Sequence, residues 1–377
     1  VQGEGAHPPA DACNFARFCS SLDFFSITDH AEGLTQEMWK DTITSIKNCD
    51  AVSDSGKKDL VAFAGWEWTQ MASTPEAHYG HKNVILRDLD NLPQKPIGAG
   101  LTGLDLMIKH EAAPLLPLIF DFPPEQIDFD FLKYRNTTYS EPFCSELEES
   151  VEVKCKEKAE NPRQLFQKLD ELKVEALVIP HGTTWGIHAP ADSSLSLQLT
   201  NELHDPKRQR LIEVYSGHGN SEIYKDFKHA VKLDDGTYAC PDPTDDFEPC
   251  CWRAGEIIRQ RCEDENAVSC LTDIEKVKKD FANDVSGFLR FGLVENASPE
   301  DWMQCGQLKN EFLPAYTYRP NMSSQAALTS MVSENGILNS FKLGLIGSTD
   351  NHKARAGPGY KELARKSISH SWRAKDK

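Results

Sequence analysis

Histidine and acidic residues recur where short apolar segments of this 377-residue chain end. Imidazole nitrogens and carboxylate oxygens are the donors that a hydrolytic Zn, Mn or Fe site uses, and paired metals share a site of this kind. A lone histidine in such a place is more often structural, but its recurrence on successive segments favours one common site. The sequence therefore predicts a metal site built from His30, Glu67, His81, His181, Asp350 and His352.

Two of these segments carry local evidence of their own. Asp350 and His352 are separated by one residue, and residues i and i+2 of an extended chain point to the same side. Glu67 stands between Trp66 and Trp68, where burying a carboxylate is costly unless it is paired or coordinates a metal. Both features favour ligands inside a site over solvated surface side chains.

Short apolar segments alternating with amphipathic ones predict the elements that position these residues. Strands are expected at 22–28, 60–66, 83–86, 176–180, 211–215 and 342–347, and helices include 36–49 and 163–172. This alternation is typical of a parallel sheet or barrel with helices outside. In such α/β folds the active site lies at the carboxyl ends of the strands, where most of the ionisable positions fall.

Longer blocks around these positions resemble the PHP (polymerase and histidinol phosphatase) superfamily, and most closely the bacterial family called domain of unknown function 3604. The resemblance extends from about His7 to Glu362. It rests on the segments GWEWTQ, HYGHKNVILRD, EVYSGHGNSE, CCWRAGEIIRQRC, LPAYTYRP and STDNHKARAGPGYKE.

The resemblance implies a single α/β domain over residues 1–377, folded as a distorted seven-stranded PHP-type β/α barrel. Segment 232–314, rich in Cys, Pro and Asp, is expected to be a Cys-rich insertion between the last two strands. PHP proteins open with an H-x-H strand, and His7 lies in a proline-rich segment that does not fit that motif. The first strand and its ligands are therefore expected to be missing from this chain, through a fragmentary sequence or a truncation.

The same pattern implies two or three divalent metal ions. The predicted ligands resemble those of three metals: Asp350 for the first, Glu67 bridging the first and second, His81 and His181 for the second, and His30 and His352 for the third.

Further residues are candidates for catalysis and substrate binding. Asp29 is expected to orient a ligand imidazole, and His218 is a candidate proton donor. Arg319, Lys353 and Arg355 are the cations nearest in sequence to the predicted site. Arg319 is the first choice for anchoring an anion because a guanidinium can bind phosphate bidentately. The alternative is that all three cations form surface ion pairs.

Three classes of function remain open. The resemblance implies a phosphoesterase in which a metal-bridging hydroxide attacks phosphorus. The same site could instead hydrolyse a sulfate ester or an organophosphate triester. A barrel that has lost its metal would be a binding module without catalytic activity. Metal analysis separates the third class from the others, and paired phosphate and sulfate esters separate the first two.

Composition narrows the partners and the compartment. A formal charge of −17 argues against nucleic acid, so a small anionic ester must be attracted by local cations or metal. No apolar run reaches the roughly 18 residues of a membrane-spanning helix. Eleven cysteines without a CxxC motif predict disulfides in an exported bacterial protein, periplasmic or secreted, although reduced buried thiols remain an alternative. The expected bridges are Cys19–Cys49 and at least one among Cys240, Cys250, Cys251, Cys262 and Cys270.

Overall fold

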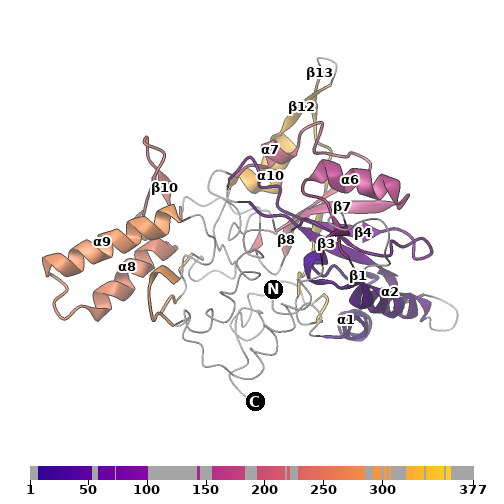
Figure 1. The fold of residues 1–377 in the computed structure, drawn as a ribbon, viewed down its shortest axis with the longest axis horizontal. Coiled ribbons are helices and arrows are strands. Elements are labelled where there is room, and N and C mark those ends of the chain that lie inside the picture. Colours follow the sequence, from indigo (N-terminus) through magenta and orange to yellow (C-terminus); the bar gives the residue numbers. More distant parts are fainter. Residues whose placement is uncertain are drawn as a thin grey trace.

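The computed structural model describes residues 7–52, 58–72, 74–100, 142–144, 155–182, 193–216, 219–220, 228–284, 292–298, 301–303, 305–306, 320–334, 337–351 and 354–357. Its helices and strands are drawn in Figure 1. The helices are α1 Pro9–Asn14, α2 Gln36–Ala51, α6 Pro162–Glu171, α7 Leu195–Gln198, α8 Cys250–Arg261, α9 Val268–Asn283 and α10 Ser324–Thr329. The strands are β1 Phe24–Ser26, β2 Val61–Phe63, β3 Gly65–Thr69, β4 His81–Leu86, β5 Ile97–Gly98, β6 Glu157–Lys158, β7 Ala176–His181, β8 Leu211–Ser216, β9 Gly219–Asn220, β10 Val231–Lys232, β11 Tyr238–Ala239, β12 Met331–Glu334, β13 Ile337–Ser340 and β14 Gly344–Gly347.

Three antiparallel strands in the order β3–β4–β7 carry three of the predicted ligands. Thr69 pairs with His81, and His81 pairs with His181, so these residues form one row across the sheet. Because β4 runs opposite to its neighbours, its amino end lies beside the carboxyl ends of β3 and β7. This arrangement explains why His81 begins its strand, whereas Thr69 and His181 end theirs and Glu67 lies two residues before the end of β3.

The remaining strands form smaller sheets. β1 pairs with β2 and β14 with β8, both in parallel, and β9 is antiparallel to β8. β5 and β6 are parallel, and β10–β11 and β12–β13 are antiparallel pairs. Each segment predicted as a strand overlaps a strand of the structure, but 60–66 divides between β2 and β3. The described strands lie in separate two- and three-stranded sheets, so the seven-stranded barrel stays a prediction.

The antiparallel pairing of β3 with β4 departs from the parallel sheet that the strand–helix alternation predicts. Parallel neighbours need a crossover of about a dozen residues or more, usually a helix. The segment between β3 and β4 has no helix among its described residues, and the chain simply reverses direction.

Helix α2 and the tryptophans of β3 form the centre of the larger core. Thr35 caps α2 by accepting a hydrogen bond from the Met38 amide at 3.3 Å. Trp39 of α2 packs edge-on against Trp66, with ring centroids 5.7 Å apart. The Trp68 indole, also fully buried, donates to a backbone carbonyl at 2.8 Å. These contacts fix β3, which carries Glu67, against the helical layer.

Helices α8 and α9 belong to a second, smaller core. They lie side by side in Figure 1, away from α2 and α6, and bury Ala254, Ile257, Val277 and Phe281. Disulfides Cys240–Cys251, Cys250–Cys305 and Cys262–Cys270 cross-link this unit. The first and third confirm the prediction of a bridge among the five clustered cysteines. In chain order the unit falls between β8 and β14, within the segment predicted as an insertion.

The predicted Cys19–Cys49 bridge is wrong. Cys49 pairs with Cys13, which is buried at the α1–α2 contact, while Cys19 is exposed with a free thiol. In the sequence, Cys13 and Cys19 both lie close before β1. Only Cys13 lies on the face of α1 that meets α2. A further bridge, Cys144–Cys155, was not anticipated. No helix in the described parts of the chain is long and apolar enough to cross a membrane.

Candidate metal centre

Glu67 is the centre of a cluster of imidazoles at the edge of the β3–β4–β7 sheet. Its Oε1 atom lies 2.8 Å from His81 Nδ1 and 3.3 Å from His30 Nδ1. Its Oε2 atom lies 3.8 Å from His181 Nε2. The Thr69 hydroxyl, two residues along the same face, donates to Oε1 at 3.1 Å. One buried carboxylate is therefore surrounded by three imidazoles and a hydroxyl.

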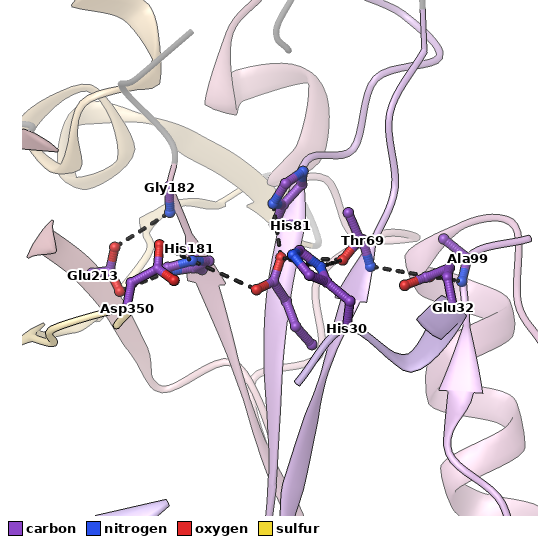
Figure 2. Close-up of polar contacts among 10 residues, drawn as sticks. His30, Glu32, Thr69, His81, Ala99, His181, Gly182, Glu213 and Asp350 are labelled. Atoms are coloured by element: carbon purple, nitrogen blue, oxygen red, sulfur yellow. Dashed lines mark hydrogen bonds and ion pairs between the residues drawn. The ribbon is translucent and has the colours of Figure 1, made fainter. Parts of the chain in front are cut away.

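Backbone pairing brings His30 to this cluster. Residues 29–30 follow β1 and run parallel to β3, where His30 forms an isolated bridge with Glu67. The Glu67 amide donates to the Asp29 carbonyl at 2.8 Å. The TDH segment therefore lies beside the centre of β3, as Figure 2 shows for His30.

The surroundings of Glu67 favour its charged form. Burial opposes ionisation of this carboxyl, but the charges of His30, His81 and His181 outweigh burial and hold its pKa well below the usual range. Burial is the largest influence on His81 and lowers the pKa of that imidazole, although Glu67 acts in the opposite direction. The lowered pKa of His81 makes its proton easier to release, and a metal binds only the deprotonated forms of imidazole and carboxyl groups.

His181 joins Glu67 to a second pair of carboxylates. Its Nε2 atom lies 3.2 Å from Asp350 Oδ2, and its Nδ1 atom lies 2.7 Å from Glu213 Oε2 (Figure 2). Glu213 also accepts hydrogen bonds from the Gly182 amide at 3.3 Å and from the Ser348 hydroxyl at 2.5 Å. Burial opposes protonation of His181, but Glu213 and Asp350 outweigh it and raise the pKa of the imidazole well above its ordinary value.

Asp350 reaches the cluster from the end of β14. Its backbone adopts φ 43°, in the left-handed region that aspartate tolerates better than most residues. Parallel pairing of β14 with β8 brings this turn beside Glu213 and His181. Unusual backbone geometry of this type concentrates at functional sites.

The donor set fits a divalent metal ion. Glu67, His181 and Asp350 each offer a ligand atom, and these atoms lie within 4.8 Å of one another. Glu213 holds His181 Nδ1, which leaves Nε2, on the side of Asp350 and Glu67, as the metal-binding atom. Imidazole with carboxylates suits Zn, Mn or Fe.

Five of the six predicted ligands converge on this cluster: His30, Glu67, His81, His181 and Asp350. Four of them, all but His81, border a cavity of about 1460 Å³, whose walls also include Asp29 and Arg355. Arg355 is exposed, and its amide donates to the Asn351 side chain at 3.2 Å. The role of Asp29 in orienting an imidazole stays a prediction. His218, Arg319, His352 and Lys353 lie outside the described residues.

Sequence reasoning missed three residues that support the cluster: Glu32, Thr69 and Glu213. Glu213 carries a signal that could have identified it, because it is a carboxylate within the apolar strand β8, as Glu67 is within β3. Glu32 and Thr69 carry no comparable signal, since acidic and hydroxyl residues near strand ends are common.

Comparison with family models, with curated proteins and with solved structures found no match for this chain. The geometry of the cluster is therefore the evidence on which a functional proposal rests.

Proposed function

We propose that this chain is a metal-dependent hydrolase of phosphoric esters, with its metal site at Glu67, His181 and Asp350. The observation that carries the proposal is the approach of three buried or half-buried ligand atoms to within 4.8 Å of one another. The resemblance to PHP proteins, in which such clusters perform phosphoester hydrolysis, supports the reaction type by analogy.

Each residue has a distinct task in this proposal. Glu67 and Asp350 supply negative charge on two sides of the metal position, while Glu213 retains the Nδ1 proton of His181 so that Nε2 faces the metal. His30 and His81, which contact the other oxygen of Glu67, would be the ligands of a further metal. The bound metal would supply Lewis acidity toward a phosphoryl oxygen and activate water at neutral pH.

The cavity wall and the disulfides support a substrate class and a compartment for this proposal. A small anionic ester would enter the cavity beside the cluster, where Arg355 is an exposed cation on the wall. Five disulfides are typical of proteins in an oxidising environment, which supports a periplasmic or secreted bacterial location.

The proposal is tested by metal analysis followed by hydrolysis of 4-nitrophenyl phosphate and 4-nitrophenyl sulfate. We expect bound divalent metal and faster cleavage of the phosphate. Asp350→Asn should lower both metal content and turnover, because the neutral amide is a weaker ligand. Asp273→Asn, on the exposed face of α9, is the matched control and should change neither.

The other outcomes separate the alternatives. A protein that binds no divalent metal would contradict the hydrolase proposal and favour a binding module. Metal binding with preferential cleavage of the sulfate would replace the phosphoesterase with a sulfatase. Normal metal content in Asp350→Asn would remove Asp350 from the site.

A further inference from the structure

The Thr69 hydroxyl contacts both Glu67 and His30. A threonine hydroxyl has one proton to donate, and Thr69 donates it to Glu67 Oε1 at 3.1 Å. The Thr69 hydroxyl oxygen is also in hydrogen-bond contact with His30 Nδ1. With the hydroxyl proton donated to Glu67, Thr69 accepts from His30, an arrangement that needs the imidazole proton on Nδ1. His30 Nε2 is then the atom with a lone pair for a metal.

The backbone of Thr69 is held in turn by Glu32. The Thr69 amide donates to Glu32 Oε1 at 3.3 Å, and the Ala99 amide donates to the same oxygen at 2.6 Å (Figure 2). Glu32 is buried, with 7% of its surface exposed, in the 3-10 turn that directly follows His30. One carboxylate oxygen therefore joins the end of β3 to the segment after β5.

The site around the Glu32 carboxylate is closely fitted. A Cβ atom on Gly98 would lie 3.2 Å from Glu32 Oε1, so the glycine leaves room for this oxygen. The Lys156 ammonium group donates to the Glu32 backbone carbonyl. Segments near residues 32, 69, 98 and 156 thus meet at one buried acidic residue, and none of these contacts is made by a proposed metal ligand.

We infer that Thr69 and Glu32 are positioning residues that orient the His30 ring with its proton on Nδ1, so that Nε2 would be the nitrogen that binds a metal. The inference rests on the proposed metal site but extends it to two residues that do not bind metal. Without the Thr69 hydroxyl, the Nδ1 proton of His30 would have only Glu67 Oε1, at 3.3 Å, among these partners. That oxygen also contacts His81 Nδ1, so His30 would be less firmly oriented.

The test compares Thr69→Val, which removes the hydroxyl at nearly constant volume, with Thr69→Ser, which retains it. The full-length protein is labelled with ¹⁵N-histidine, and the His30 resonances are assigned with a His30→Gln variant. The nitrogen shifts of metal-free protein report the tautomer directly, and chelator competition with Zn²⁺ reports metal affinity. Thr42→Val, a buried threonine on α2, is the control for losing a buried hydroxyl.

We expect His30 to be protonated on Nδ1 in wild type, Thr69→Ser and Thr42→Val. Thr69→Val should show a mixture of tautomers and a Zn²⁺ affinity lower by about 10- to 100-fold, the usual effect of losing a residue that orients a ligand. Glu32→Ala should reproduce the mixture, because the Thr69 amide loses its acceptor.

A single Nδ1-protonated form in Thr69→Val would overturn the inference, and a mixture in Thr69→Val but not in Glu32→Ala would remove Glu32 from it. The nitrogen shifts of metal-free protein decide this even if wild type binds no Zn²⁺, a result that would contradict the proposed function alone. Thermal unfolding of Thr69→Val beside Thr69→Ser identifies any loss of fold.

Discussion

Glu213 shows how a residue outside the proposed metal site can orient one of the proposed ligands. Its Oε2 atom contacts His181 Nδ1 at 2.7 Å and the Ser348 hydroxyl at 2.5 Å, while Oε1 accepts from the Gly182 amide. A carboxylate behind an imidazole fixes the tautomer and raises the basicity of the metal-binding nitrogen. The arrangement places the negative charge of Glu213 on the side of His181 opposite to the metal position.

We predict that Glu213→Gln weakens metal binding by about 10- to 100-fold, because the amide loses the charge that favours the Nδ1 proton. Chelator competition measures the effect. Ser348→Ala removes only one neutral donor to the same oxygen and should have a smaller effect. Glu175→Gln, at an exposed ion pair with Arg87, is the matched control. Equal affinities in Glu213→Gln and Glu175→Gln would contradict this role.

Lys82, which follows His81 on β4, is a different case at the residue scale, because its ammonium group is buried. Its side chain is 1% exposed, and its Nζ atom contacts the Tyr79 carbonyl, Gln198 Oε1 at 3.3 Å and the face of Trp68. None of these partners is a carboxylate. Burial lowers the pKa of Lys82 from 10.5 to about 7.

This shift predicts a pH dependence of stability. Between pH 7 and 10.5 the unfolded chain binds a proton at Lys82 that the folded chain does not bind, so the free energy of unfolding rises with pH. The loss of stability caused by burying Lys82 is complete below its pKa in the folded chain, about 7, and absent above its pKa in the unfolded chain, 10.5. Urea denaturation between pH 7.5 and 9 should show a slope of about 1 kcal/mol per pH unit that Lys82→Met lacks. Parallel slopes in the two proteins would contradict the prediction.

At the scale of elements, the sequence was informative where propensity and burial agree. The amphipathic segments 36–49 and 163–172 became α2 and α6, within two residues at each end. The sequence does not predict the division of 60–66 into β2 and β3, because that division depends on how closely β4 packs against Gly65. A Cβ atom on Gly65 would lie 2.5 Å from the Val84 carbonyl of β4. Only the paired strands show that this position requires glycine.

In the candidate site, too, local sequence signals identified some residues, whereas tertiary contacts determined the others. Chemical type identified Glu67 because it is a carboxylate between two tryptophans, and it identified the histidines because they recur on successive segments. The supporting contacts of Glu32 and Thr69 connect segments 37 residues apart, which no local pattern encodes. The pairing of Cys13 in place of Cys19 likewise depends on which face of the first helix meets α2.

The disulfides of the α8–α9 unit give a prediction at this scale. Cys250–Cys305 closes 55 residues of sequence and ties α8 to a segment beyond α9. We predict that a Cys250→Ser/Cys305→Ser double variant destabilises this unit by about 2–4 kcal/mol, mainly through the entropy of the unfolded chain. Limited proteolysis should cut within 228–306 first. Cys19→Ser, at an exposed free thiol, is the control and should leave the digestion pattern unchanged.

At the scale of the whole molecule, the cluster draws on distant parts of the chain. His30 follows β1, Glu67 and His81 lie on β3 and β4, His181 ends β7 and Asp350 follows β14. Five segments must therefore pack correctly before the ligand atoms meet. Metal binding should in turn stabilise the fold that assembles them, since a ligand that binds only the folded state shifts the equilibrium toward it.

Net charge gives the last prediction, because an anionic substrate must approach a protein of formal charge −17. At long range this field repels the substrate, whereas attraction by the metal acts only near the site. The screening length falls from about 30 Å at 0.01 M salt to about 10 Å at 0.1 M. Added salt should therefore remove much of the repulsion while leaving the short-range attraction largely intact.

We accordingly predict that kcat/KM for 4-nitrophenyl phosphate rises between 0.01 and about 0.1 M potassium chloride, across the range in which screening shortens most. Repeating the series with potassium acetate at equal ionic strength separates screening from competition by one particular anion. A fall in kcat/KM in both salts would mean that cations on the cavity wall, among them Arg87, Arg208 and Arg355, dominate the approach over the net charge. Charge reversal by Arg355→Glu would then reduce the fall, because it removes one of the local positive charges that salt screens.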